Sequence, residues 1–179
     1  MTTGDVLYDL YESNETDTAR FVLGVEGKPK LYVFCLNPST ANKEKTDTTI
    51  TKVKKVARQA GFQGFVMLNL YPLRSTKPKG LPQNPDPQQI EQNVNHIISL
   101  VEDDKSPVFW AAWGVNIMLR SYLAQSLQLI ASRVNNLGGS WRNYGELTRD
   151  GHPRHPSRLS YSSKFSKFEI SEYLRLISR

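Results

Sequence analysis

The chain alternates between short apolar runs and longer segments in which apolar residues recur every three or four positions. The short runs are rich in β-branched and aromatic residues, and turn-forming residues flank most of them, which is typical of strands. The pattern of residues 5–12 is ambiguous, and residues 13–18 form a predicted polar turn. Strands are therefore predicted over residues 20–26, 31–36, 65–70, 108–113 and 141–147.

The periodic segments predict amphipathic helices between these strands. The first helix ends at Gly61, and its lysines and arginine are typical of a solvated helix face. The predicted inward positions are Val53, Val56, Ala57 and Ala60 in the first helix, and Ile90, Val94, Ile97 and Val101 in the second. Further helices are predicted over residues 116–132 and 166–178.

Alternation of strands and helices predicts an α/β fold, because right-handed crossovers place helices on both faces of a mainly parallel sheet. We expect a three-layer α/β/α arrangement with about four core strands, in one domain covering residues 1–179. The turn at residues 27–30 predicts that the strands over 20–26 and 31–36 form an N-terminal hairpin.

Polar residues stand at or just after the ends of four predicted strands: Asn37, Asn69, Gly114 and His155. In parallel sheets, ligands bind outside the carboxyl ends of the strands. Four segments that are far apart in the sequence should therefore meet at one edge of the sheet. This edge is the predicted site of function.

The segment from Asp150 to Ser160 has the sequence DGHPRHPSRLS, in which a proline follows each of His152 and His155. Two prolines exclude a helix or a central strand, so the segment should be a loop that displays side chains. A metal site is one alternative, but the only cysteine, Cys35, lies far away in a predicted strand. A plain surface loop is the other alternative, and His96, on the second helix, is expected to be structural.

The formal net charge of +6 and the isoelectric point of about 9.4 favour a polyanionic partner. Apolar runs are too short to span a membrane, and the first residues lack the pattern of a signal peptide. A single cysteine allows no internal disulfide. We expect a cytoplasmic protein without a membrane partner.

The predicted edge offers amides, imidazole, hydroxyls and arginines, but no carboxylate pair and no glycine-rich phosphate loop. A serine–histidine pair involving Ser39 or Ser157 is conceivable, yet the Gly-x-Ser-x-Gly motif of many serine hydrolases is missing. Such groups can hold a planar heterocycle, orient a water molecule and stabilise a developing anion.

Four blocks, NPST, NLYPLRST, AAWG and DGHPRHP, resemble those of the uracil-DNA glycosylase superfamily. As a set they look like a family described only as a domain of unknown function. The most specific block is His155-Pro-Ser-Arg-Leu-Ser160, followed by the phenylalanines of residues 165–168 and by Tyr173-Leu174. The resemblance covers residues 31–175, which is most of the chain.

The resemblance implies a role for each matching residue. His155 would stabilise the negative charge on the departing base, and Asn37 would position the attacking water. Asn69 would read the edge of a pyrimidine. Ser157 would contact the DNA backbone, and Leu159 would wedge into the duplex where the flipped nucleotide had been.

Three departures from the superfamily pattern affect the details. Cys35 stands where a glycine is usual. No aromatic residue clearly matches the one that stacks on the base, so Tyr71 and Trp141 are the candidates. Ser39 replaces a bulky tyrosine that excludes a substituent at C5 of the pyrimidine, which predicts a more open pocket.

We therefore expect a monofunctional DNA glycosylase that flips and excises a modified, C5-substituted pyrimidine such as the hypermodified cytosine of phage DNA. Catalytic residues would be Asn37 and His155, without metal or other cofactor. The resemblance and the basic loops predict that Asn69, Ser39 and Tyr71 bind the base and that Arg74, Lys77, Arg154, Ser157, Arg158 and Leu159 bind DNA. The protein would act as a monomer, in base-excision repair or in antiviral defence.

Two alternatives remain open. The first is a module of the same fold that binds nucleotides or single-stranded nucleic acid without cleaving them, which Asn37 in place of an acid favours. The second is an N-glycosidase acting on free nucleotides, which Leu159 and the basic loops disfavour. Formation of abasic sites separates the enzyme from the binding module.

Overall fold

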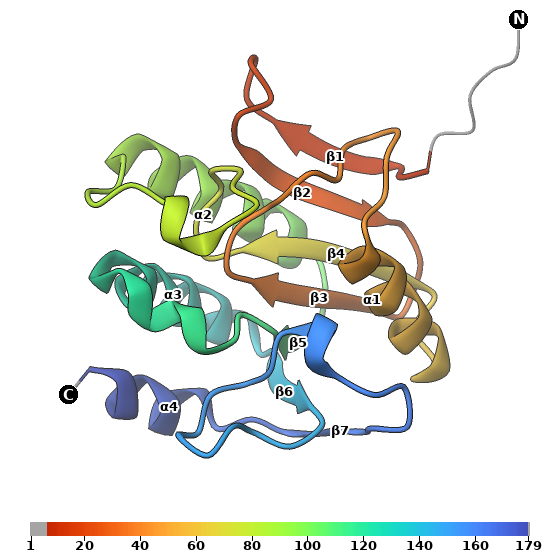
Figure 1. The fold of residues 1–179 in the computed structure, drawn as a ribbon. Coiled ribbons are helices and arrows are strands. Elements are labelled where there is room, and N and C mark those ends of the chain that lie inside the picture. Colours follow the sequence, from red (N-terminus) through yellow and green to blue (C-terminus); the bar gives the residue numbers. More distant parts are fainter. Residues whose placement is uncertain (1–6, 179) are drawn as a thin grey trace, which may run out of the picture.

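The computed structural model describes residues 7–178, and its centre is one seven-stranded sheet (Figure 1). The strand order across the sheet is β1-β2-β4-β3-β5-β6-β7. The sequence pattern of residues 1–6, on which the signal-peptide expectation partly rests, lies outside the described residues. The strands are β1 (Leu10–Ser13), β2 (Arg20–Val25), β3 (Lys30–Cys35), β4 (Gly64–Asn69), β5 (Val108–Ala111), β6 (Ser140–Tyr144) and β7 (Phe165–Lys167).

The four central strands, β4, β3, β5 and β6, are parallel, as the alternation of elements predicts. β3 lies in the middle, where Val33 pairs with Met67 of β4 on one side and with Trp110 of β5 on the other. Its residues 31–35 are all buried, because both faces of the sheet are covered. The predicted α/β class and the number of core strands are confirmed.

The N-terminal hairpin joins different strands from those predicted. β2 and β3 do not pair with each other, because β4 lies between them, antiparallel to β2 and parallel to β3. The hairpin partner of β2 is β1, through the polar turn whose Asn14 side chain accepts a hydrogen bond from the amide of Ala19. The 27–30 segment instead passes across the start of β4, where the carbonyl of Pro29 accepts from the amide of Gln63.

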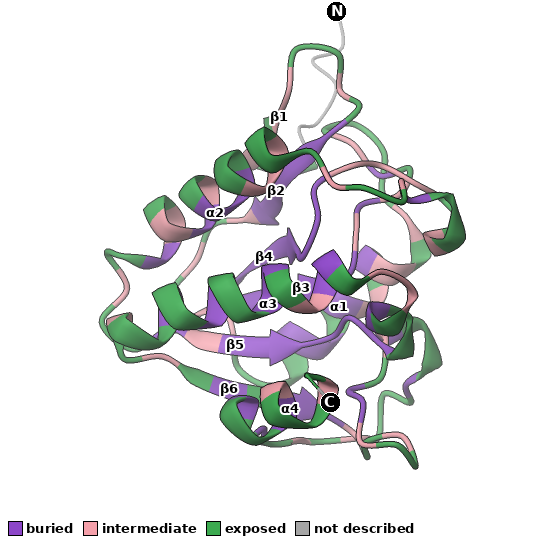
Figure 2. Cartoon of the chain, turned by 90° about the vertical axis from the view of Figure 1, so that its left-hand side faces the viewer, coloured by how far each residue is buried: buried purple, intermediate pink, exposed green. Residues whose placement is uncertain are grey.

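Helices cover both faces of the sheet. α1 (Thr48–Gln59) packs on one face, where its side chains join Leu31 and Val33 in a buried cluster. α2 (Pro87–Val101), α3 (Ser121–Val134) and α4 (Ile170–Ile177) pack on the other. Figure 2 shows β4 and β5 buried along almost their whole length between the helices.

Several predicted boundaries were wrong. Ala60 lies just beyond α1 and is exposed rather than inward. The predicted helix over 166–178 begins only at Ile170, because residues 165–167 form β7 and pair with β6. A short 3₁₀ helix, η2 (Val115–Leu119), precedes α3 within the predicted 116–132 helix. β6 ends at Tyr144, before Gly145 takes a positive φ of 74°.

Among residues 7–178, no helix is long and apolar enough to cross a membrane. The longest helix, α2, has 15 residues, and it presents Val94, Ile97 and Val101 to the core.

The close backbone approach in the antiparallel part of the sheet predicts a sensitive position at Gly24. A Cβ atom on Gly24 would overlap the carbonyl oxygen of Phe65 and lie 2.9 Å from the Cα of Val66. We expect Gly24→Ala to lower the free energy of unfolding by about 1–3 kcal/mol, the cost of overpacking. Equilibrium unfolding in urea measures this free energy for the wild type and the variant. Gly80→Ala is the control, because its Cβ would meet only the Ser75 side chain, at 3.0 Å; equal stability of both variants would contradict the argument.

Candidate functional site

The direction of chain winding reverses between β3 and β5. From β3 the chain crosses through α1 to β4 on one side, and from β4 it returns through α2 to β5 on the other. The segments that leave the carboxyl ends of β3 and β5 therefore diverge to opposite faces, and a crevice forms between them. Asn37 follows β3, and Gly114 follows β5.

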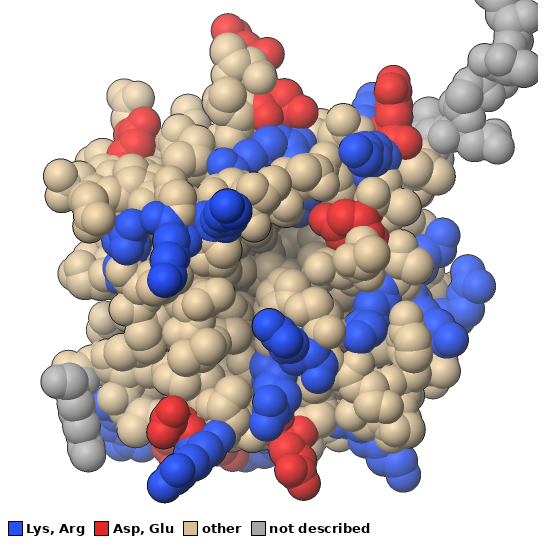
Figure 3. All heavy atoms as spheres, viewed as in Figure 1, with Lys and Arg blue, Asp and Glu red and all other residues tan. Residues whose placement is uncertain are grey.

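A cleft with a volume of about 830 Å³ lies at this position. Its size falls within the range of about 300–1,000 Å³ that is usual for small-molecule sites. The face shown in Figure 3 has a hollow near its centre, bordered by lysine and arginine side chains. The cleft is lined by residues 36, 37, 39, 49, 75, 76, 78, 113–116, 148, 153–155, 157 and 158.

Asn37 lines this cleft, and its amide group has a defined orientation. Its Nδ2 donates to the carbonyl oxygens of Pro38, at 3.0 Å, and of Ser75, at 2.9 Å. Carbonyl oxygens only accept hydrogen bonds, so these two contacts fix which end of the amide is nitrogen. The Oδ1 atom, for which the described residues supply no donor, is therefore the atom available to a water molecule or a ligand.

Ser157 fixes the orientation of the His155 imidazole. Its Nδ1 lies 2.8 Å from the Ser157 hydroxyl and accepts a hydrogen bond from the Ser157 backbone amide at 3.3 Å. A backbone amide can only donate, so in the neutral ring the proton lies on Nε2. His155 caps the short 3₁₀ helix η4 (Pro156–Arg158), which fixes the ring relative to the cleft wall.

The surroundings of His155 keep the ring neutral. Burial is the largest effect and lowers the pKa of His155, and the positive charges of Arg158 and Lys52 lower it further. Asp47, the N-cap residue of α1, acts in the opposite direction. The net result is a pKa below the ordinary value, so at neutral pH the imidazole offers an N–H donor without carrying a charge.

Gly114 allows the β5 and histidine segments to approach. It has a φ of 74°, which residues with side chains rarely adopt, and a Cβ atom there would lie 3.4 Å from the Cβ of His155. The preceding residue, Trp113, is buried and forms part of the cleft wall. The prediction that the Gly114 and His155 segments meet at one edge is therefore confirmed by the geometry.

His152 faces the interior rather than the cleft. It is 7% exposed, and its Nδ1 lies 2.8 Å from the hydroxyl of Tyr173 on α4. The same hydroxyl accepts a hydrogen bond from Nε1 of Trp113 at 3.0 Å. His152 thus links the loop to α4 and to the cleft wall, while His155 faces outward. No cluster of three or more metal-ligating side chains occurs among residues 7–178.

Arg74 is a structural residue, not a free phosphate ligand as predicted. Its guanidinium donates to the carbonyls of Ser39 and Ala41, at 2.8 and 2.7 Å, and pairs with Asp17 at 3.0 Å. Asp17 and two loop carbonyls thus occupy most of its donors. Arg74 therefore shapes the segment that carries Ser39, but it does not line the cleft.

Asn69 and Tyr71, predicted to bind the base, do not line the cleft. Asn69 is 1% exposed and its Nδ2 has no partner among the described residues. Tyr71 is also 1% exposed, and its hydroxyl accepts from the amide of Asp86. The other stacking candidate, Trp141, is buried as well, so neither aromatic residue is placed to stack on a ligand in the cleft.

Leu159, the predicted duplex wedge, is buried rather than protruding. It is 7% exposed and belongs to the core cluster on the α1 face. Nζ of Lys52 on α1 donates to its carbonyl oxygen at 2.7 Å, which holds the segment against the helix. The physical reason is that η4 packs directly on α1, so the apolar side chain turns inward.

The remaining predicted residues reach the cleft or its rim. Ser39, Ser157, Arg154 and Arg158 line it, and the last three are exposed. Lys77 is exposed beside the lining residues Thr76 and Pro78.

Sequence reasoning missed several lining residues, including Thr49, Ser75, Asn116 and Thr148. Thr49 lies in the first turn of α1, Asn116 lies in η2, and Ser75 and Thr148 lie in loops that follow β4 and β6. The signal that could have found the loop residues was the rule already used for Asn37, applied to the residues just beyond each strand end.

A family model described as "Protein of unknown function (DUF1643)" matches residues 20–157. The chain belongs to this family. The match includes Asn37, Gly114 and His155, and all the residues that line the cleft except Arg158. It ends before β7 and α4. No curated protein and no solved structure matches the chain with significance.

The environment of His155 predicts its titration. By ¹H–¹⁵N NMR of the imidazole, we expect a pKa below 6.5 and the proton of the neutral form on Nε2. Arg158→Ala should raise this pKa, because a positive charge is removed, and Asp47→Asn should lower it. Asparagine also caps helices, so the second change leaves α1 intact. Neutral His155 with its proton on Nδ1 would contradict the assigned geometry.

Proposed function

We propose that the protein is a monofunctional DNA glycosylase that hydrolyses the N-glycosidic bond of a modified pyrimidine nucleotide. The observation that carries this proposal is the presence, in one cleft, of His155 and Asn37, whose Nε2–H and amide oxygen have no hydrogen-bond partner within residues 7–178. One group can donate to a leaving anion, and the other can accept from a water molecule.

The chemistry needs no strong base. As the bond from sugar C1′ to the base breaks, its electron pair leaves with the base, and the Nε2–H of His155 stabilises the resulting anion. The sugar becomes oxocarbenium-like, and a water oriented by the Asn37 oxygen adds to C1′. One proton of that water passes to solvent or to the departed base, which leaves an abasic site. A neutral donor suits this step, because it holds no charge that must be solvated before the reaction.

The resemblance to the uracil-DNA glycosylase superfamily supports the assignment. Each of its four blocks contributes lining residues to the cleft, among them Asn37, Ser75, Gly114 and His155. An α/β fold with four central parallel strands is compatible with that superfamily. The single cysteine fits a cytoplasmic protein, and the net positive charge fits one that acts on DNA.

The room near the base favours a C5-substituted pyrimidine. Ser39 has a short side chain at the cleft, and Arg74 holds its carbonyl in place. A substituted base of this kind is the modified cytosine of phage DNA, which fits a defensive role, and damaged pyrimidines fit repair. Because Leu159 is buried, a target base that is already unpaired is the simpler substrate, since a single strand needs no wedge.

One observation favours the alternative of a binding module that does not cleave. The residues that line the cleft include no aspartate or glutamate. A site without a carboxylate can still bind a nucleotide, but it activates a water molecule only weakly. Cleavage of the N-glycosidic bond therefore distinguishes the enzyme from the binding module.

The first test of the proposal is removal of His155. Single-stranded DNAs carrying 5-hydroxymethylcytosine, 5-hydroxymethyluracil or uracil are incubated with the protein, and abasic sites are cleaved with alkali. We expect His155→Ala to reduce the single-turnover rate by about 100-fold or more, as loss of one preorganised donor does. His96→Ala is the control, because His96 lies on α2, where it stacks on Phe21 of β2, and it does not line the cleft. Equal rates for the wild type and His155→Ala would sink the assignment.

The second test concerns the base itself. We expect the wild type to excise a 5-hydroxymethylated pyrimidine faster than unsubstituted uracil, because Ser39 leaves space at C5. Ser39→Tyr should reverse or erase this preference by steric overlap, whereas Ser39→Ala should keep it. The measurement compares single-turnover rates on DNAs that differ only at that base. A wild-type preference for uracil would refute the open pocket without refuting the glycosylase.

A further inference from the structure

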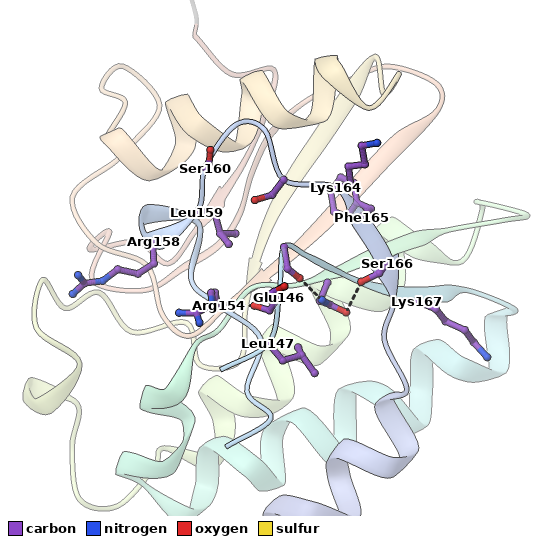
Figure 4. A pocket seen from close by; sticks show the side chains of 13 residues that line it. Glu146, Leu147, Arg154, Arg158, Leu159, Ser160, Lys164, Phe165, Ser166 and Lys167 are labelled. Atoms are coloured by element: carbon purple, nitrogen blue, oxygen red, sulfur yellow. Dashed lines mark hydrogen bonds between the residues drawn. The ribbon is translucent and has the colours of Figure 1, made fainter. Parts of the chain in front are cut away.

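A second cavity, with a volume of about 780 Å³, adjoins the cleft. It lies between the loop after β6, the segment after η4, and β7 (Figure 4). Two residues, Arg154 and Arg158, line both the cleft and this cavity, so the two spaces share a wall. The proposed reaction at Asn37 and His155 makes no use of the second cavity.

The cavity is positively charged. Its lining includes four cationic side chains, Arg154, Arg158, Lys164 and Lys167, and one carboxylate, Glu146. Lys167 is paired with Glu169, which leaves the other three cations to attract an anion. Figure 4 shows the two arginines on one side of the cavity and the two lysines on the other.

Arg154 is already held in place at the shared wall. Its Nε donates to the carbonyl oxygen of Glu146 at 3.0 Å. This contact directs the guanidinium along the wall while leaving its two terminal nitrogens free of hydrogen bonds within residues 7–178. A phosphate group between the two spaces would meet donors that need little reorganisation.

Three apolar side chains, Leu147, Leu159 and Phe165, lie among the polar and charged residues that line the cavity. Leu147 is 39% exposed there, and it belongs to neither core cluster. Phe165 is partly buried, with its ring centroid 5.2 Å from that of Trp110 and 4.9 Å from that of Tyr144. Leu159 completes this surface between the charged sides. Figure 4 shows Leu147 and Leu159 between the arginines and the lysines.

Hydrogen bonds fix the polar part of the lining. The buried Asn143 donates from Nδ2 to the carbonyl of Gly145 at 2.7 Å and accepts from the Ser166 hydroxyl at 3.3 Å. These bonds join β6, β7 and the following loop into one frame. Asn143 therefore holds this part of the lining in a defined position.

We propose that this second cavity binds the nucleotide next to the target nucleotide on the same strand. The base of that neighbour lies against Leu147 and the exposed part of Phe165. The phosphate that joins the two nucleotides lies at the shared wall, between Arg154 and Arg158. This inference rests on the part of the proposed function that makes the ligand a nucleic-acid strand, and it does not depend on cleavage.

Charge and adjacency favour this occupant over others. A lining that combines three apolar side chains with cationic side chains on both sides matches a nucleotide, which has a flat, weakly polar base and an anionic phosphate. An acidic peptide would use the charges but not the flat surface. A shared wall with the target cleft is the geometry that a phosphodiester link requires, because consecutive nucleotides must occupy consecutive spaces.

The test measures binding by fluorescence anisotropy. The probe is a short single-stranded DNA with 5-hydroxymethylcytosine at the target position and fluorine at its sugar C2′, which slows loss of the base. In two further probes, the base on the 5′ side or on the 3′ side of the target is deleted. For the wild type we expect deletion on one side to weaken binding by about fivefold or more, as loss of one stacked or packed base does, and deletion on the other side to have little effect.

Variants assign this loss to the cavity. Leu147→Ala should bind the intact probe less tightly and lose most of its sensitivity to the deleted base, because the contact is already gone. Leu129→Ala is the matched control, since Leu129 on α3 has a similar exposure of 36% and lies outside both cavities. It should behave as the wild type does. Both leucines are partly exposed, so neither change is expected to affect folding.

A second arm tests the shared phosphate. Replacing the linkage between the two nucleotides by an uncharged methylphosphonate should weaken binding to the wild type but change little in Arg158→Ala. Sensitivity to neither neighbouring base, or equal sensitivity in Leu147→Ala, would overturn the inference. If the neighbour effect is found but no DNA yields abasic sites, the second cavity stands and the glycosylase proposal fails. If abasic sites form without any neighbour effect, the glycosylase proposal stands and the second cavity fails as a nucleotide site.

Discussion

The parallel pairing of β3 with two strands is the constraint on which the site depends. β3 pairs in parallel with β4 on one side and with β5 on the other, and it is buried on both faces. At the carboxyl end of such a strand, the connections that follow it and its neighbour run to opposite faces of the sheet. Asn37 stands just beyond that release, with Gly114 beyond the equivalent end of β5. The position of the cleft thus follows from the strand order, and the side chains determine only its chemical character.

Within the cleft, Asn37 and His155 each have one polar atom held by hydrogen bonds within the chain and a second polar atom available to a ligand. Asn37 uses its amide nitrogen to hold the chain at Pro38 and Ser75, which leaves its oxygen available. His155 uses Nδ1 to accept from Ser157, which leaves Nε2–H available. In both cases a local hydrogen bond orients the polar atom before any ligand arrives. Such preorganisation is what gives a weak donor or acceptor catalytic value.

Sequence patterns predicted the fold well where burial alone decides the structure. Runs such as that of β3 indicate a central strand, and the residues at strand ends follow from the topology. The patterns failed where a distant segment competes: β4 enters between β2 and β3, so the expected hairpin cannot form. The direction of a side chain was the least predictable feature. Leu159 and Arg74 stand in suitable loops, but contacts with α1 and with Asp17, which no local pattern connects to them, keep both from the positions predicted for them.

The contact of Tyr173 with Trp113 and His152 extends the structural unit beyond the residues that match the family. The family model stops at residue 157, yet Tyr173, on α4, hydrogen-bonds both the cleft wall and the histidine loop. β7 also completes the sheet beside β6. The segment that can be recognised by descent is therefore shorter than the segment that must fold together. Relatives whose sequences diverge after the histidine loop need another way to support the same tryptophan.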